Sequence, residues 1–138
     1  MKRVLIIASH HKFADGLKDT LNFISGGIQE TVALSAYVDN QPVEAAVDAL
    51  MNQYSEEDEL VILTDLTSGS VNQQFFRFRS RPHTHIVSGM NLPIALQVAM
   101  EPQDTYISAE RMHQMVEEAK EDMKYVNEIV DDGDDEDE

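Results

Sequence analysis

The stretch Val4-Leu5-Ile6-Ile7-Ala8-Ser9-His10-His11-Lys12-Phe13-Ala14-Asp15-Gly16-Leu17 decides how this chain folds. It begins as an unbroken apolar run, stops at two histidines and then continues with apolar residues at helical spacing. The run is typical of a parallel strand buried on both faces, and the later spacing predicts a helix directly behind it. Binding groups gather beyond the carboxyl ends of the strands in an open α/β sheet, so His10 and His11 lie where a functional site is expected.

The rest of the chain repeats this alternation of strand and helix. The first strand is predicted over residues 3–8, and further strands over Thr31–Val38, Leu60–Thr64 and His85–Gly89. Apolar spacing and capping residues predict helices over residues 12–24 and 43–54, through Phe75 and Phe76, over Leu92–Met100 and from Ser108 onward. The buried stripe of the first helix is predicted to consist of Phe13, Leu17, Leu21 and Ile24.

This order of elements predicts an α/β protein with an open, doubly wound, mostly parallel sheet and helices on both faces. With the strands numbered along the chain, we expect the flavodoxin-like order 2-1-3-4. Met123 to Val130 carries a weaker pattern, compatible with a final antiparallel strand or with a continuation of the last helix. Residues 1–130 are predicted to form one domain, followed by an acidic disordered tail over residues 131–138.

Composition excludes several classes of function. The formal net charge is −16, and the tail contributes seven of the negative charges, which leaves −9 on the domain. That balance argues against nucleic-acid binding, which needs a cationic surface. The chain has no cysteine, so disulfides and thiol catalysis are excluded. No apolar run is long enough to span a bilayer and no signal-peptide cleavage site follows Met1, so we expect a cytoplasmic protein.

The predicted sheet order brings two strand ends together. His10 ends the first strand and Asp65 follows the third, and neighbouring strands lie about 4.8 Å apart. A carboxylate beside an imidazole can accept the Nδ1 proton and leave Nε2 as a nucleophile. The polar loop that follows offers amides and hydroxyls at the start of a helix, a suitable cradle for a phosphoryl group. Its members are Thr67, Ser68, Gly69 and Ser70. Together these residues predict a phosphohistidine site.

At three segments the sequence resembles a known family, the mannose-family enzyme IIA domains of the bacterial phosphoenolpyruvate-dependent sugar phosphotransferase system. The segments are Ile6-Ile7-Ala8-Ser9-His10, Leu63-Thr64-Asp65-Leu66-Thr67-Ser68-Gly69-Ser70-Val71-Asn72 and Gly89-Met90-Asn91-Leu92-Pro93. The resemblance extends over about residues 2–130.

The chain departs from the family pattern at Ser68, where glycine is common, and at Ser9, where threonine is frequent. His11 follows the histidine where small residues often stand. Ser9 and His11 are therefore secondary candidates for the site.

The resemblance implies a phosphotransferase that needs no cofactor. His10 matches the histidine that accepts a phosphoryl group from phospho-HPr and passes it to a histidine of enzyme IIB, here a separate protein. Asp65 matches the carboxylate that orients it, and Ser70 matches the group that holds the phosphoryl oxygens. Family members are homodimers that exchange a carboxy-terminal antiparallel strand, whose place Met123 to Val130 occupies here. Membrane subunits would be partners only indirectly, and no residue of this chain would choose the sugar.

Two other functions remain open at this stage. A related phosphocarrier drives dihydroxyacetone phosphorylation by similar chemistry, and a flavodoxin-like module could bind an anion or a protein partner without catalysis. A metal site is not expected. His83 and His85 are spaced to share a strand face, but they lie at the amino end of the fourth strand with no third ligand nearby in the sequence.

Overall fold

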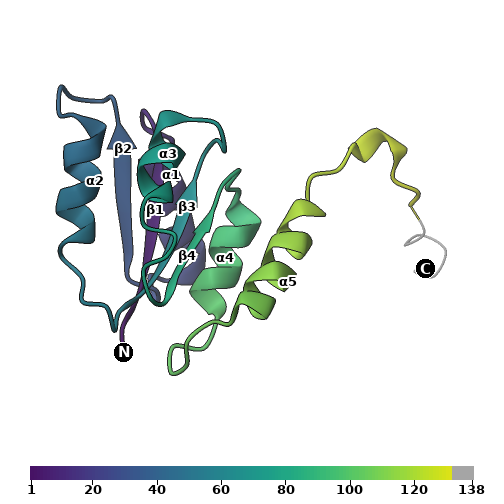
Figure 1. Ribbon diagram of the computed structural model, residues 1–138. Coiled ribbons are helices and arrows are strands. Elements are labelled where there is room, and N and C mark those ends of the chain that lie inside the picture. The colour runs from purple at the N-terminus through teal and green to yellow at the C-terminus, as the bar shows by residue number, and fades with distance from the viewer. Residues whose placement is uncertain (132–138) are drawn as a thin grey trace.

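The computed structural model describes residues 1–131, and over this range the chain forms a sheet of four parallel strands (Figure 1). The strands are β1 (Arg3–His10), β2 (Thr31–Ala36), β3 (Glu59–Thr64) and β4 (Thr84–Val87), and they lie in the order β2-β1-β3-β4. The predicted fold class and strand order are therefore confirmed. β1 is longer than predicted, so His10 is itself the last residue of the strand, and β2 ends at Ala36 instead of Val38.

Helices cover both faces of the sheet, as predicted for a doubly wound fold. One face carries α1 (Phe13–Ser25), α4 (Leu92–Met100) and α5 (Ala109–Lys120), and the other carries α2 (Val43–Met51) and α3 (Ser70–Phe76). The side chains of β1 alternate between the two layers. Leu5 and Ile7 pack under the first set of helices, and Val4, Ile6 and Ala8 pack under the second. The continuous apolar run thus serves two cores at once.

The buried stripe of α1 differs from the prediction. Ala14, Leu17 and Leu21 are buried, at spacings of three and four, whereas Phe13 is 50% exposed and Ile24 is 52% exposed. The first buried residue of the stripe is Ala14 and not Phe13, so the stripe begins one residue later than predicted. The phenyl ring of Phe13 therefore lies at the edge of the stripe. The side chain of Phe13 is therefore half exposed to solvent near the carboxyl end of β1.

The carboxy-terminal segment is not a strand within this single chain. Met123 to Val130 contains only the short 3₁₀ helix η1 (Val126–Glu128), and Figure 1 shows this part of the chain leading away from the sheet. Strand exchange between two chains stays a prediction, and the tail predicted over residues 131–138 lies almost wholly outside the described residues. Within residues 1–131 no helix has the length and hydropathy needed to cross a membrane.

A buried ion pair at the amino end of the sheet was not predicted. The side chains of Arg3 and Glu59 are both 0% exposed, and Arg3 Nε lies 2.6 Å from Glu59 Oε1. Arg3 also donates to the carbonyl oxygens of Glu101 and Thr105, while the second carboxylate oxygen of Glu59 accepts from the amide of Ile107. The pair therefore fastens the connection between α4 and α5 to strands β1 and β3.

Replacing one member of this pair should be more costly than replacing both. Glu59→Met leaves the Arg3 charge buried and unpaired, and we expect the free energy of unfolding to fall by about 3–5 kcal/mol. Arg3→Met/Glu59→Met should recover much of that loss. Lys2→Met is the matched control, because Lys2 pairs with Glu30 at 3.7 Å with both side chains about half exposed. It should change stability by less than about 1 kcal/mol in urea unfolding. Equal losses in Lys2→Met and Glu59→Met would contradict this account.

Candidate active site

The direction of winding reverses between β1 and β3, and the candidate site lies at the carboxyl ends of these two strands. Ala8 of β1 pairs with Thr64 of β3, so the chain passes from Thr64 into Asp65 beside the last residues of β1. On the other side His10 pairs with Ala36, the last residue of β2. Three strands therefore end around one imidazole, in the crevice where ligands bind in such sheets.

His10 is held by the carboxylate of Asp65 through two hydrogen bonds. Asp65 Oδ2 lies 2.9 Å from His10 Nδ1 and accepts from the backbone N–H of His10 at 2.8 Å. Burial by itself raises the pKa of Asp65, but the hydrogen bonds from the backbone and the imidazole of His10, with the imidazole charge, outweigh burial and lower it. An ionised Asp65 can only accept a hydrogen bond, so Nδ1 of the neutral ring carries the proton and Nε2 keeps its lone pair.

The Nε2 side of the ring faces two hydroxyl groups. Ser70 Oγ lies 3.4 Å from His10 Nε2, and the Tyr37 hydroxyl lies 2.6 Å from Ser70 Oγ. The ring of Tyr37 stacks on the imidazole, with 5.5 Å between ring centroids and 27° between the planes. Sequence reasoning missed Tyr37. The available signal was its position near the end of the predicted strand Thr31–Val38, which neighbours the first strand in the predicted order.

The loop after Asp65 approaches the imidazole very closely at Gly69. A Cβ atom built on Gly69 would lie 2.8 Å from His10 Cε1, which is closer than carbon atoms pack. Asn72 fixes the same loop to the end of β3, because its side chain accepts from the Thr64 hydroxyl at 2.8 Å and donates to the Thr67 carbonyl oxygen at 2.9 Å. The loop that was predicted as a cradle thus lies against His10 with a fixed backbone.

The remaining predicted residues are placed differently. The hydroxyl of Thr67 lies 2.5 Å from the hydroxyl of Ser88, directly after β4, and Ser68 is exposed.

Ser9 is fully buried, accepts from the Ala14 amide at 2.7 Å and donates to the His11 carbonyl oxygen at 3.2 Å. It therefore anchors the start of α1. His11 is exposed on a left-handed backbone with φ of 55°.

The two histidines near β4 have separate partners. His83 stacks on Tyr106, with centroids 3.6 Å apart, and His85 Nε2 lies 2.8 Å from the Ile107 carbonyl oxygen. In the described part of the chain, no group of three or more histidine, aspartate or glutamate side chains is placed to hold a metal ion. The residues around His10 offer one imidazole, one carboxylate and hydroxyl groups, and this set suits nucleophilic chemistry toward an electrophile such as a phosphoryl group.

Comparison with known proteins gives matches over almost the whole chain. Residues 4–116 match the family model EIIA-man, described as the fructose IIA component of the phosphotransferase system. A putative phosphoenolpyruvate-dependent sugar phosphotransferase system permease from Klebsiella pneumoniae is 37% identical, with 93% of each chain covered and a TM-score of 0.83.

Two more distant structures share the fold. The mannose/sorbose-specific IIA subunit from Enterococcus faecalis is 19% identical, with 95% of this chain and 96% of that chain covered and a TM-score of 0.74. The IIA protein associated with the fucose utilization operon of Streptococcus pneumoniae is 23% identical, with 92% and 95% covered and a TM-score of 0.75.

The close approach at Gly69 can be tested without reference to function. Gly69 has an ordinary φ of −78°, so Gly69→Ala adds no backbone strain and forces His10 away from its position. We expect NMR of the imidazole to show a weakened Nδ1–H hydrogen bond to Asp65. Gly16→Ala in α1 is the matched control, because no atom lies within 4 Å of the added Cβ. It should leave His10 unchanged and stabilise the protein by up to about 1 kcal/mol. An unperturbed imidazole in Gly69→Ala would refute the close packing.

Proposed function

This chain belongs to the family of IIA components of the sugar phosphotransferase system, and from that premise we propose that it is a phosphocarrier. In this proposal His10 accepts a phosphoryl group from phospho-HPr and passes it to a histidine of a separate enzyme IIB, which couples the transfer to sugar uptake and phosphorylation. The observation that carries the proposal is the pair of contacts on one imidazole, with Asp65 at Nδ1 and Ser70 at Nε2.

The geometry supports Nε2 as the nucleophile. Asp65 holds the Nδ1 proton, so the lone pair of Nε2 attacks phosphorus while the N–P bond of the donor phosphohistidine breaks. The electron pair of that bond returns to the donor nitrogen, and a new N–P bond forms at Nε2. The ring becomes more positive as this bond forms, and the Asp65 carboxylate 2.9 Å from Nδ1 stabilises that charge. Transfer to enzyme IIB is the same step in reverse, with His10 as the leaving group.

The loop after Asp65 supplies the groups that would hold the phosphoryl oxygens. Ser70 reaches Nε2 with its hydroxyl, and Gly69 brings the backbone next to the imidazole because it has no side chain. The first N–H groups of a helix have no partner within the helix, and α3 begins at Ser70. We assign Thr67, Ser68, Gly69 and Ser70 to phosphoryl binding. Because donor and acceptor are both phosphohistidines, the reaction needs positioning and charge stabilisation but no cofactor.

Phosphorylation of purified protein tests this proposal. Incubation with enzyme I, HPr and phosphoenolpyruvate should add one acid-labile, base-stable phosphoryl group, detected by intact-protein mass spectrometry. His10→Ala should abolish it, whereas His11→Ala, the matched control, should be labelled normally. Ser70→Ala should slow labelling by about 10²-fold, the usual effect of removing one preorganised donor. Labelling that persists in His10→Ala would overturn the assignment.

The choice of acceptor separates the sugar pathway from its alternatives. Phosphorylated protein is offered either a sugar-specific enzyme IIB or the subunits of dihydroxyacetone kinase. Transfer to enzyme IIB alone is the expected result, and transfer only to the kinase subunits would assign the protein to that second pathway. A chain that is never phosphorylated but still binds HPr or enzyme IIB would be a non-catalytic module.

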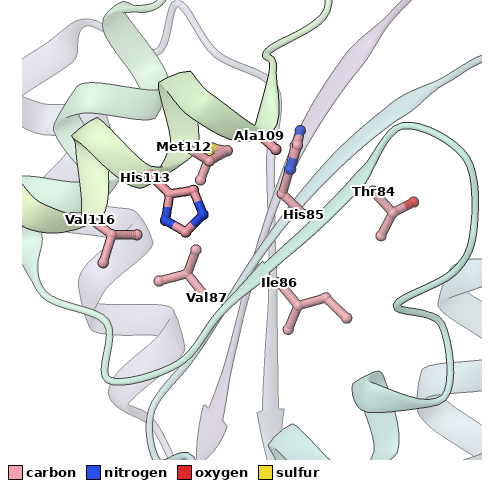
Figure 2. Close-up of a pocket in the computed structure, with 8 residues that line it drawn as sticks. All are labelled: Thr84, His85, Ile86, Val87, Ala109, Met112, His113 and Val116. Carbon is pink, nitrogen blue, oxygen red and sulfur yellow. The ribbon is translucent and has the colours of Figure 1, made fainter.

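We also propose that the protein is a homodimer that exchanges its carboxy-terminal segment. In the described part of the chain β4 pairs with β3 alone, so its other edge is open. Figure 2 shows a groove beside this edge, in which His113 and Val116 of α5 project toward Val87 of β4. The segment after α5 carries apolar side chains that are more than half exposed, namely Met123, Tyr125, Val126, Ile129 and Val130. An open edge and an exposed apolar segment in the same chain can satisfy each other between two copies.

Sedimentation velocity tests the exchange. The native chain should sediment as a dimer, and Tyr125→Asp/Ile129→Asp should shift it toward the monomer, because two charges would enter an apolar interface. Phe23→Asp is the matched control, since Phe23 is an apolar side chain of α1 that is 88% exposed and far from β4 in the sequence. A native chain that stays monomeric at tens of micromolar would contradict the proposal, and so would a double variant that remains dimeric.

A further inference from the structure

Tyr37 occupies a strained backbone conformation next to His10. Its φ is 66°, in the left-handed region that bulky residues with a Cβ rarely adopt. A left-handed backbone at such a residue lowers the folding stability by about 1–3 kcal/mol. It persists only where the surrounding structure holds it, often at functional sites. Tyr37 is 52% exposed and belongs to neither apolar core, so core packing does not account for this conformation. The strained backbone serves to bring the ring over His10 and the hydroxyl to Ser70.

The contacts around His10 fix the direction of a chain of hydrogen bonds. In the neutral imidazole, which is the nucleophilic form, ionised Asp65 accepts the Nδ1 proton and Nε2 can only accept. The Ser70 hydroxyl is then the donor across the 3.4 Å between them. The Ser70 proton is then committed to His10. Ser70 Oγ must therefore accept at the 2.6 Å contact with the Tyr37 hydroxyl, which is the donor. The chain runs from Tyr37 through Ser70 and His10 to Asp65.

We propose that Tyr37 is a positioning residue for phosphoryl transfer and that it acts through Ser70. This inference rests on the proposed function and deepens it. When Nε2 forms its bond to phosphorus, its lone pair is used and it can no longer accept from Ser70. The Ser70 proton then turns to a phosphoryl oxygen, while the Tyr37 hydroxyl continues to donate to Ser70 Oγ. Tyr37 thus keeps the Ser70 oxygen in place and ensures that its single proton points to the phosphoryl group.

The effect of Tyr37 should be visible in the transition state more than in partner binding. The hydroxyl of Tyr37 is occupied by Ser70, and its contribution is to orient a group that touches the transferred phosphoryl group. We therefore expect Tyr37→Phe, which keeps the aromatic ring, to lower kcat for transfer from phospho-HPr by about tenfold, the size of one lost hydrogen bond at a charged site. The KM for phospho-HPr should change little. A change confined to KM would overturn the positioning role.

Tyr106→Phe is the matched control for this measurement. The Tyr106 hydroxyl donates to the Glu57 carbonyl oxygen at 2.9 Å, near the start of β3 at the opposite end of the sheet. Its loss should leave kcat and KM unchanged while costing stability to a similar extent. If Tyr37→Phe and Tyr106→Phe lower kcat equally, the effect is one of general stability and the proposal fails.

A double-mutant cycle with Ser70→Ala tests whether Tyr37 acts through Ser70. In that background the Tyr37 hydroxyl has nothing left to orient, so Tyr37→Phe should have no further effect on the rate. Additive effects of the two substitutions would show that Tyr37 acts independently and would overturn the proposal.

The cycle is repeated with phosphoramidate, a small phosphoryl donor that needs no protein partner. If HPr fails to label native His10 while phosphoramidate labels it, the proposed donor is wrong but the coupling of Tyr37 to Ser70 is still measured. If native His10 accepts from neither donor, both proposals fall.

Discussion

The site depends on one interaction, the contact of a single carboxylate oxygen of Asp65 with both the backbone N–H and the Nδ1 of His10. The backbone bond fixes where the end of β1 lies, and the side-chain bond fixes which nitrogen of the imidazole keeps its lone pair. Both require that β1 and β3 be neighbours in the register that pairs Ala8 with Thr64. A slip of one residue would turn either His10 or Asp65 toward the opposite face of the sheet. The two apolar cores, which share the side chains of β1 between them, prevent that slip.

Around this contact the atoms are closely packed and the backbone of Tyr37 is strained. The rigid sheet beneath it offsets the cost of that strain. Gly69 touches the imidazole where any side chain would collide, and Tyr37 accepts a left-handed backbone to reach Ser70. The Asn72 side chain joins Thr64 to the Thr67 carbonyl and so prevents the loop from relaxing away. Each of these features would be unfavourable in a flexible segment. Together they give Nε2 fixed surroundings, which is what the proposed phosphoryl transfer requires.

Periodicity predicted the fold, and the residues at the strand ends predicted that Asp65 lies beside His10, because both follow from local patterns and one topological rule. The order 2-1-3-4 by itself places Asp65 beside His10. What pattern analysis could not supply were contacts that depend on exact side-chain directions. Tyr37 was missed because nothing in the letters around it predicts a left-handed turn, and Arg3 with Glu59 because two charged residues at strand starts are usually solvated. In α1 the one-residue shift from Phe13 to Ala14 changed which side chain is buried.

The site and the open edge of the sheet are physically connected. Thr67, in the loop against His10, bonds through its hydroxyl to Ser88, which directly follows β4. β4 is the strand whose free edge the exchanged segment of a second copy would cover. A strand added there would fix the end of β4, and through the pair of hydroxyls it would also fix the loop that carries Gly69. In the proposed dimer, the added strand would act on the candidate site by holding the end of β4, to which the loop after Asp65 is bonded. The order β2-β1-β3-β4 would therefore link the proposed assembly at one edge of the sheet to the proposed chemistry at its centre, through the hydrogen bond between Thr67 and Ser88.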